Sequence, residues 1–238
     1  MIGGYAFLTR FPNLFIVYLI SLLLILTVTI GILHRISKKK FEEEVMTHFN
    51  NCRVRVFIEE VTNLMGKRRD RQISSFYASL CATGYDVLGD YDALFASCQN
   101  IKLKSHMPVY HRRMFTYYMS RNELDYAKDA LDALSKLAES EKIPAEKKLI
   151  IQFEEECKRA LLIRNGEYEE PLKYFGEMIK STDPMPLVSR VSWSYVYGEL
   201  LYLTGEAEAA KEPLLFASSR GGDTRYKKQA DKLLEKIG

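Results

Sequence analysis

Apolar side chains follow two different patterns along this chain. Residues 14–33 read LFIVYLISLLLILTVTIGIL and contain no charged side chain. Beyond residue 40, apolar positions recur every three or four residues, which is the spacing of a helix with one buried face. Residues 54–58 alternate briefly in the manner of a strand, but the helical stripe there continues to Met65. The pattern therefore predicts an all-α chain.

The uncharged run predicts a transmembrane helix. Twenty helical residues rise by about 30 Å, which is the hydrocarbon thickness of a bilayer. A cleavable signal peptide would have a shorter apolar core followed by a small-residue cleavage site, whereas His34 and basic residues follow here. We expect residues 1–13 to form a short extracytoplasmic N-terminus and residues 14–33 to cross the membrane once.

Basic residues predict the orientation of this helix. Arg10 precedes the run closely, and four basic residues follow it: Arg35, Lys38, Lys39 and Lys40. Positive charge favours the cytoplasmic side, so the large C-terminal part is expected in the cytoplasm and the protein in a cell membrane, most naturally a bacterial one. The four residues are also expected to contact anionic headgroups, each contributing about 1 kcal/mol.

Residues 34–70 are interpreted as a juxtamembrane helical linker. The stripe from Val54 to Met65 predicts an amphipathic helix, for which Asn51 is a candidate N-cap and Gly66 a stop. The basic cluster 67–71 fits a solvated turn best and lipid contact next. Nucleic acid is the least favoured partner, because no aromatic residues lie between the basic ones and the net charge is only +3.

Residues 71–238 contain four similar helix–turn–helix segments. Their turns begin at Gly89, Asn122, Gly166 and Gly205, at intervals of 33, 44 and 39 residues. Gly and Asn tolerate the left-handed backbone that ends a helix. Acidic residues follow each of them and favour the start of the next helix.

The last segment carries the fullest set of periodic small and large residues: Tyr197, Gly198, Leu201, Gly205, Ala207, Ala210, Leu214 and Ala217. In this, the chain resembles the tetratricopeptide repeat (TPR) family over about 165 residues. Phe115 in the second segment and Lys158 and Arg159 in the third depart from the family pattern. The resemblance implies a right-handed solenoid of helix hairpins, in which each pair buries its apolar face against its neighbours. A terminal capping helix over 224–237 would close the solenoid.

The resemblance also implies a concave groove that binds a protein or peptide, lined by the first helix of each pair. By family register the groove would carry Ser79, Thr83, Asp86, Arg112, Thr116, Met119, Tyr195, Glu199 and Tyr202. Tyr, Arg and Met suit such a role, because these side chains are common at protein interfaces. The alternative is that some of these residues pack against the capping helix.

Motifs for catalysis are lacking: the sequence has no phosphate-binding loop, no Gly-x-Ser-x-Gly and no His-Glu-x-x-His. Its four cysteines form no Cys-x-x-Cys pair, so we expect small core residues in a reducing compartment. His106 and His111 have too few neighbouring ligands for a metal site, and the run Glu154–Glu156 fits a solvated helix face. We expect no enzyme activity, no cofactor and no metal.

These observations favour a membrane-anchored cytoplasmic scaffold that mediates protein–protein interaction. One alternative is a subunit of a membrane assembly that acts through its transmembrane helix, where Thr27, Thr29 and Gly31 would allow close approach of another helix. A second alternative is an enzyme with an unrecognised helical site.

Overall fold

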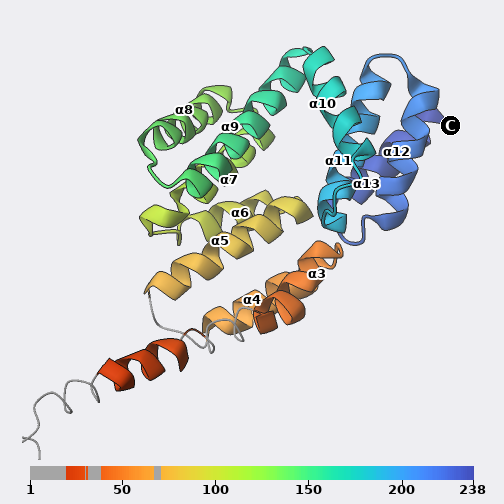
Figure 1. Ribbon diagram of the computed structural model, residues 1–238. Helices are drawn as coiled ribbons and strands as arrows, with labels where there is room; N and C mark the ends of the chain where they lie inside the picture. The colour runs from red at the N-terminus through yellow and green to blue at the C-terminus, as the bar shows by residue number, and fades with distance from the viewer. Residues whose placement is uncertain (1–19, 30, 32–38, 67–70) are drawn as a thin grey trace, which may run out of the picture. The chain divides into compact units, whose positions relative to one another are not determined.

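The computed structural model describes residues 20–29, 31, 39–66 and 71–238 (Figure 1). The chain divides into two compact units, residues 1–46 and residues 47–238. Residues 14–19, 30, 32 and 33 of the predicted membrane helix lie outside the described residues, as do Arg35, Lys38 and residues 67–70 of the basic cluster.

In the first unit, residues 20–29 are helical. Seven apolar side chains of this segment are more than half exposed: Ile20, Leu22, Leu23, Leu24, Ile25, Leu26 and Val28. The described parts of the chain include no helix that is both long and apolar enough to cross a membrane. A π-helix, η1 (Glu42–Met46), follows. Lys39 and Lys40, predicted to contact lipid, lie 3.6 and 3.7 Å from Glu43 and Glu44 in ion pairs.

The second unit is built from α-helices, with one short 3-10 turn, η2 (Lys104–His106). The helices are α3 (Thr47–Asn50), α4 (Val54–Gly66), α5 (Arg71–Leu88), α6 (Tyr91–Cys98), α7 (Met107–Ser120), α8 (Leu124–Ser140), α9 (Pro144–Asn165), α10 (Glu169–Lys180), α11 (Leu187–Leu203), α12 (Ala207–Arg220) and α13 (Arg225–Ile237). Residues 47–66 and 71–238 contain no strand. The all-α prediction is confirmed for the described residues.

Four helix hairpins follow one another from α5 to α12, and Figure 1 shows them arranged around an arc. The residues predicted to end their first helices, Gly89, Asn122, Gly166 and Gly205, have φ values of 78°, 62°, 84° and 89°. The predicted left-handed turns are thus confirmed. Helix α13 also forms where a capping helix was expected, beginning after Thr224.

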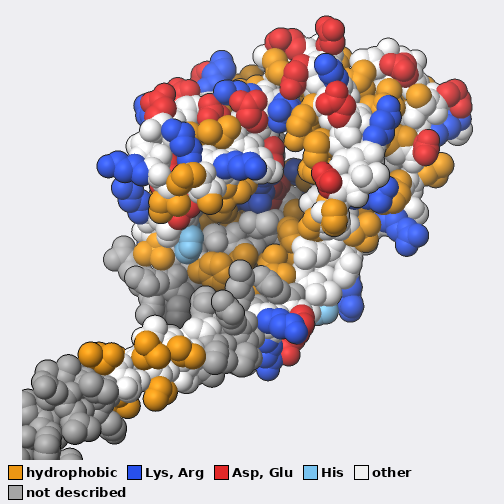
Figure 2. All heavy atoms as spheres, viewed as in Figure 1, with side chains coloured by type: hydrophobic (Ala, Val, Ile, Leu, Met, Phe, Trp, Pro, Cys, Tyr) orange, Lys and Arg blue, Asp and Glu red, His pale blue; other side chains and the backbone are white. Residues whose placement is uncertain are grey.

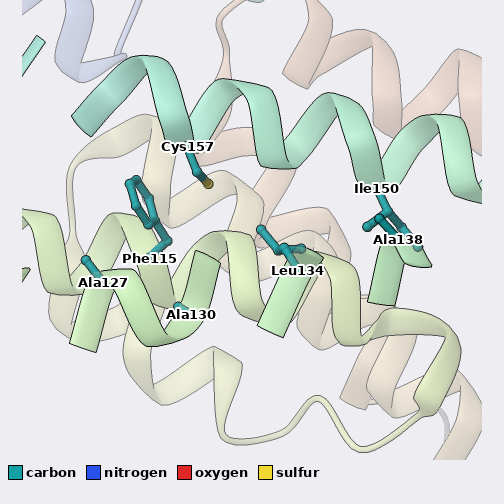
Figure 3. Close-up of a cluster of buried hydrophobic side chains, with 7 residues drawn as sticks. All are labelled: Phe115, Ala127, Ala130, Leu134, Ala138, Ile150 and Cys157. Carbon is teal, nitrogen blue, oxygen red and sulfur yellow. The ribbon is translucent and has the colours of Figure 1, made fainter. Parts of the chain in front are cut away.

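The core of the second unit consists of small side chains packed against larger ones. Figure 3 shows one cluster, in which α8 contributes three alanines and a leucine between α7 and α9. Leu134 of α8 is fully buried, which contributes roughly 1.5–3 kcal/mol. Phe115 of α7 departs from the family pattern, yet it is 3% exposed beside Ala127 and Ala130. The larger side chain fits because α8 presents alanines to it.

The helix α4 belongs to the same compact unit as the hairpins, although the sequence placed it in a linker. It packs on α5. A Cβ atom at Gly84 would lie 2.6 Å from Cγ1 of Ile58, so the two helices approach closely there. Gly66 is the last residue of α4, as expected. Residues 47–66 are therefore structural partners of the first hairpin.

The two ends of the second unit meet at the start of α4. The carboxylate of Asp223, in the α12–α13 loop, accepts hydrogen bonds from the backbone N–H groups of Val54 and Arg55 at 2.8 and 2.9 Å. The prediction of Asn51 as the N-cap is wrong, because Asp223 supplies that capping oxygen. The backbone N–H of Asp223 in turn donates to the carbonyl of Cys52 at 3.2 Å. The C-terminal helix is therefore attached to the beginning of the helical unit.

Candidate binding cleft

A cleft lies between the first helices of the hairpins and the C-terminal helix. It consists of two adjoining cavities of about 200 and 220 Å³. Five residues line both cavities: Asp86, Arg112, Glu156, Ser192 and Tyr226. Figure 2 shows a hollow in the surface of the helical unit, with basic and acidic side chains inside it. These residues come from α5, α7, α9, α11 and α13, which lie far apart in the sequence.

Asp86 of α5 is the most buried charge of the cleft, and two arginines share it. Arg113 of α7 donates to its Oδ2 through Nη1, and Nη2 of Arg225 in α13 lies 3.2 Å from its Oδ1. Arg113 also donates to Oγ1 of Thr83 at 3.3 Å. The side chains of Asp86 and Arg113 are only 6% and 9% exposed. Buried charges are tolerated only when they are paired. The two ion pairs of Asp86 therefore hold α5, α7 and α13 together.

A second ion pair joins α7 to α9. Arg112 places its Nε and Nη2 atoms 2.8 and 2.5 Å from Oε2 of Glu156. The other oxygen, Oε1, accepts a hydrogen bond from Gln152 at 3.2 Å. The guanidinium carbon of Arg112 also lies 5.1 Å from the ring centre of Phe153, within cation–π range. Both charged side chains keep some exposure, at 23% and 30%.

The charges of the cleft shift one another's protonation equilibria. Burial by itself would raise the pKa of Asp86, but Arg225, Arg113 and Arg112 outweigh it and hold this pKa below its ordinary value. Burial lowers the pKa of Arg113, and the nearby charge of Arg112 lowers it further, against the opposing effect of Asp86. Three guanidinium groups thus share two carboxylates.

Apolar and aromatic side chains form the walls around these charges. The larger ones are Phe49, Phe115, Phe153, Phe175, Val188, Trp193, Val196 and Tyr226. Tyr226 lies beside Arg225, whose guanidinium carbon is 5.1 Å from its ring centre. Arginines next to aromatic surfaces are enriched at protein interfaces, so the cleft has the composition of a recognition site.

Four of the nine predicted groove residues line the cleft: Thr83, Asp86, Arg112 and Thr116. The other two predicted residues on α5 and α7, Ser79 and Met119, do not line the cleft. Ser79 is buried and its hydroxyl donates to the carbonyl of Phe76 at 2.7 Å, while Met119 packs against the cluster between α7, α8 and α9. Those two side chains serve the fold.

The three predicted residues of α11 also lie outside the lining of the two cavities. Tyr195 is 7% exposed, its ring centre is 5.9 Å from that of Tyr226 in α13, and its hydroxyl donates to Oε1 of Glu199 at 2.5 Å. Burial raises the pKa of both Tyr195 and Glu199. Tyr202 is half-buried. Packing against the C-terminal helix, the alternative considered for the groove residues, accounts for Tyr195.

The sequence did not identify four charged residues of the cleft: Arg113, Glu156, Arg159 and Arg225. Glu156 was grouped with its neighbours as a solvated face, but it lies directly before the buried Cys157. Its position beside an apolar stripe was the available signal. Arg225 carried no such signal, because it reaches the cleft only through the attachment of α13 to α4.

The remaining candidate chemistry of the sequence is dispersed. No group of three or more His, Cys, Asp or Glu side chains within the described ranges is arranged to hold a metal ion. Nδ1 of His106 lies 3.2 Å from the hydroxyl of Ser75, which accepts the N–H groups of Lys102 and Leu103. All four cysteines are free and buried, which confirms the prediction that they are core residues.

The fold and the cleft together define an all-α protein of helix hairpins with a charged internal cleft. Comparison with models of protein families, with curated proteins and with solved structures found no match to the chain.

Proposed function

We propose that this protein is a membrane-anchored scaffold, whose helical unit is a TPR-like, right-handed solenoid that binds a segment of another protein. The observation that carries the proposal is the cleft itself. Seven helices contribute to one surface that combines arginines, carboxylates and aromatic rings. Such side chains provide most of the binding energy at protein interfaces.

The division of the cleft into two small cavities supports a peptide segment as its ligand. The cavities measure about 200 and 220 Å³, so each alone is smaller than the roughly 300–1,000 Å³ of a site for a drug-sized molecule. Two adjoining cavities of this size suit two or three successive side chains. The charges along the cleft would then fix the register of the segment, and the aromatic walls would cover its apolar atoms.

The proposed anchor rests on residues 14–33 and on what is described of them. The helix over 20–29 exposes apolar side chains, and Thr27 and Thr29 donate to the carbonyls of Leu23 and Ile25 at 2.8 Å. Both hydroxyls are thereby satisfied within their own helix, as a lipid environment requires. The basic residues after the run favour a cytoplasmic location for the helical unit, and the four free cysteines suit a reducing compartment.

Site-specific photo-cross-linking in intact membranes tests this function. A photoreactive amino acid replaces Thr116 inside the cleft in one full-length variant, and the exposed Lys128 of α8 in a control. We expect a discrete adduct from position 116 and none from position 128. A Thr116→Trp variant should fill the cleft and lose the partner, whereas Lys128→Trp should keep it. A partner that is retained by Thr116→Trp, or that requires only residues 1–46, would move the function away from the cleft.

A further inference from the structure

The charges that line the cleft do not balance. Three guanidinium groups, those of Arg112, Arg113 and Arg225, contact only two carboxylates, those of Asp86 and Glu156. The least exposed members are Asp86 and Arg113. One positive charge therefore remains without a carboxylate in a largely buried environment, which is unfavourable unless an anion compensates it.

Other carboxyl groups near the cleft do not supply the missing charge. Glu199 accepts a hydrogen bond from Tyr195, and among the described residues its carboxylate forms no ion pair with Arg112, Arg113 or Arg225. A fourth arginine, Arg159, lines the far end of the cleft and has carboxylates of its own, Glu170 at 3.1 Å and Glu155 at 3.7 Å. The excess charge thus belongs to the three central arginines.

Three buried polar atoms of this cluster also lack a hydrogen-bond partner within the described part of the chain: two donors, Nε of Arg113 and Nε of Arg225, and one acceptor, Oδ1 of Asp86. The Nε atoms of Arg113 and Arg225 are buried, and no acceptor among the described residues receives a hydrogen bond from them. Buried donors without acceptors are rare in proteins, and each one that occurs requires an explanation. Arginine binds carboxylate and phosphate groups strongly, because its planar N–H groups match their oxygens. An anion in the cleft would satisfy both the charge and the donors.

We propose that the cleft binds a negatively charged group, a carboxylate or phosphate, borne by the peptide segment that occupies it. This identifies the chemistry of the ligand and rests on the proposed function for its source. Arg112 and Arg225 are similarly accessible, with side chains 23% and 22% exposed, but of the two only Arg112 lines both cavities, so it is the main contact. Glu156 now occupies Arg112 through a single oxygen, so the incoming anion competes with Glu156.

The test uses the full-length chain in nanodiscs and inorganic phosphate as the first probe, titrated calorimetrically at constant ionic strength set with sodium chloride. We expect saturable binding that Arg112→Gln weakens by tenfold or more. Glu156→Gln should tighten it several-fold, since it removes the internal competitor. A gain of affinity cannot arise from misfolding, which keeps the test decisive if the arginine variant is unstable. Arg121→Gln, which alters an exposed ion pair with Asp92, serves as the matched control and should change nothing.

The second probe distinguishes an ion from a peptide. Triglutamate should bind and displace phosphate, whereas triglutamine should do neither. Binding of phosphate without triglutamate would overturn a peptide carboxylate as the ligand, and a phosphoserine tripeptide should then displace phosphate; failure of that peptide as well would overturn the peptide-borne source. Absence of saturable binding for both anions would overturn the inference, as would equal affinities in Arg112→Gln, Glu156→Gln and Arg121→Gln. A partner cross-linked at position 116 without any anion binding would leave the proposed function standing and refute only this inference.

Discussion

Asp223 caps the helix that begins at Val54, 169 residues earlier in the chain. Its carboxylate neutralises part of the positive end of α4 and fixes the start of α13 two residues further on. Arg225 thereby comes within 3.2 Å of Asp86, so one arginine of the cleft depends on this long-range cap. Closure of the helical unit and construction of the cleft are consequently linked.

Removal of this cap should destabilise the unit more than removal of a local one. Asp223→Ala is expected to lower the free energy of unfolding by about 2 kcal/mol, the upper end for N-cap losses, because it also releases the α12–α13 loop. Asp90→Ala is the control, since Asp90 caps only α6, by accepting from Ala93 at 3.1 Å. Urea titrations of both variants would show the difference. Equal losses would mean that Asp223 does no more than cap a helix.

Gly222 should tolerate substitution less well than a glycine of similar backbone conformation elsewhere. Its φ is +56°, and an added Cβ would lie 2.2 Å from the carbonyl oxygen of Cys52. Gly205 has a φ of +89° with nothing within 4 Å of the corresponding position. Gly205→Ala therefore involves backbone strain alone, about 1–2 kcal/mol, while Gly222→Ala must also displace the contact that closes the unit. Thermal unfolding of the two variants tests this order.

The local parts of this fold were predictable from the sequence and the long-range parts were not. The turns at Gly89 and Gly205 followed from a left-handed position and the acidic residues after it, which are neighbours in the chain. Asn51 was a reasonable local cap, but Asp223 replaced it from the opposite end of the chain. No local sequence pattern indicates such a contact between distant residues.

The same distinction applies to the cleft. The resemblance to the TPR family implied that Asp86 and Arg112 share one surface, and both line the cleft. Their partners were missed. Glu156 depends on the rotation of α9 against α7, and Arg225 depends on where α13 attaches. Charge balance within the cleft could only be assessed once these contacts were known.

Loss of the buried carboxylate should be more damaging than any other single change in the cleft. Asp86→Asn leaves Arg113 and Arg225 without a counter-charge, and breaking a buried ion pair in this way typically reduces stability by about 3–5 kcal/mol. Urea unfolding at pH 7 measures the loss. Thr83→Val, which removes only the 3.3 Å hydrogen bond from Arg113, is the milder comparison.

Lowering the pH should reduce the difference in unfolding free energy between wild type and Asp86→Asn. The direction of this effect follows from the pKa of Asp86. Its arginine neighbours overcome burial and place the folded pKa below the unfolded value of about 3.9. The carboxylate therefore contributes its full stability above pH ~4, and that contribution is lost as the pH falls through the folded pKa. Wild type and Asp86→Asn should converge in unfolding free energy as the pH falls from about 4 through the folded pKa of Asp86. A gap that stays constant throughout this acid titration would show that the asparagine acts through packing.

His106, the last residue of η2, and His111 of α7 should make the stability of the second unit depend on pH in a second range, from about pH 6.5 downward. Burial lowers the pKa of both His106 and His111 below the ordinary value. The folded state thus binds fewer protons than the unfolded state, whose histidine pKa is about 6.5, and stability is fully present above that value. It should fall as the pH decreases from 6.5 through the folded pKa values. Urea midpoints measured between pH 8 and pH 5 should decline for the wild type, and the double variant His106→Gln, His111→Gln should flatten this decline. A decline of equal size in the double variant would assign the effect to other groups.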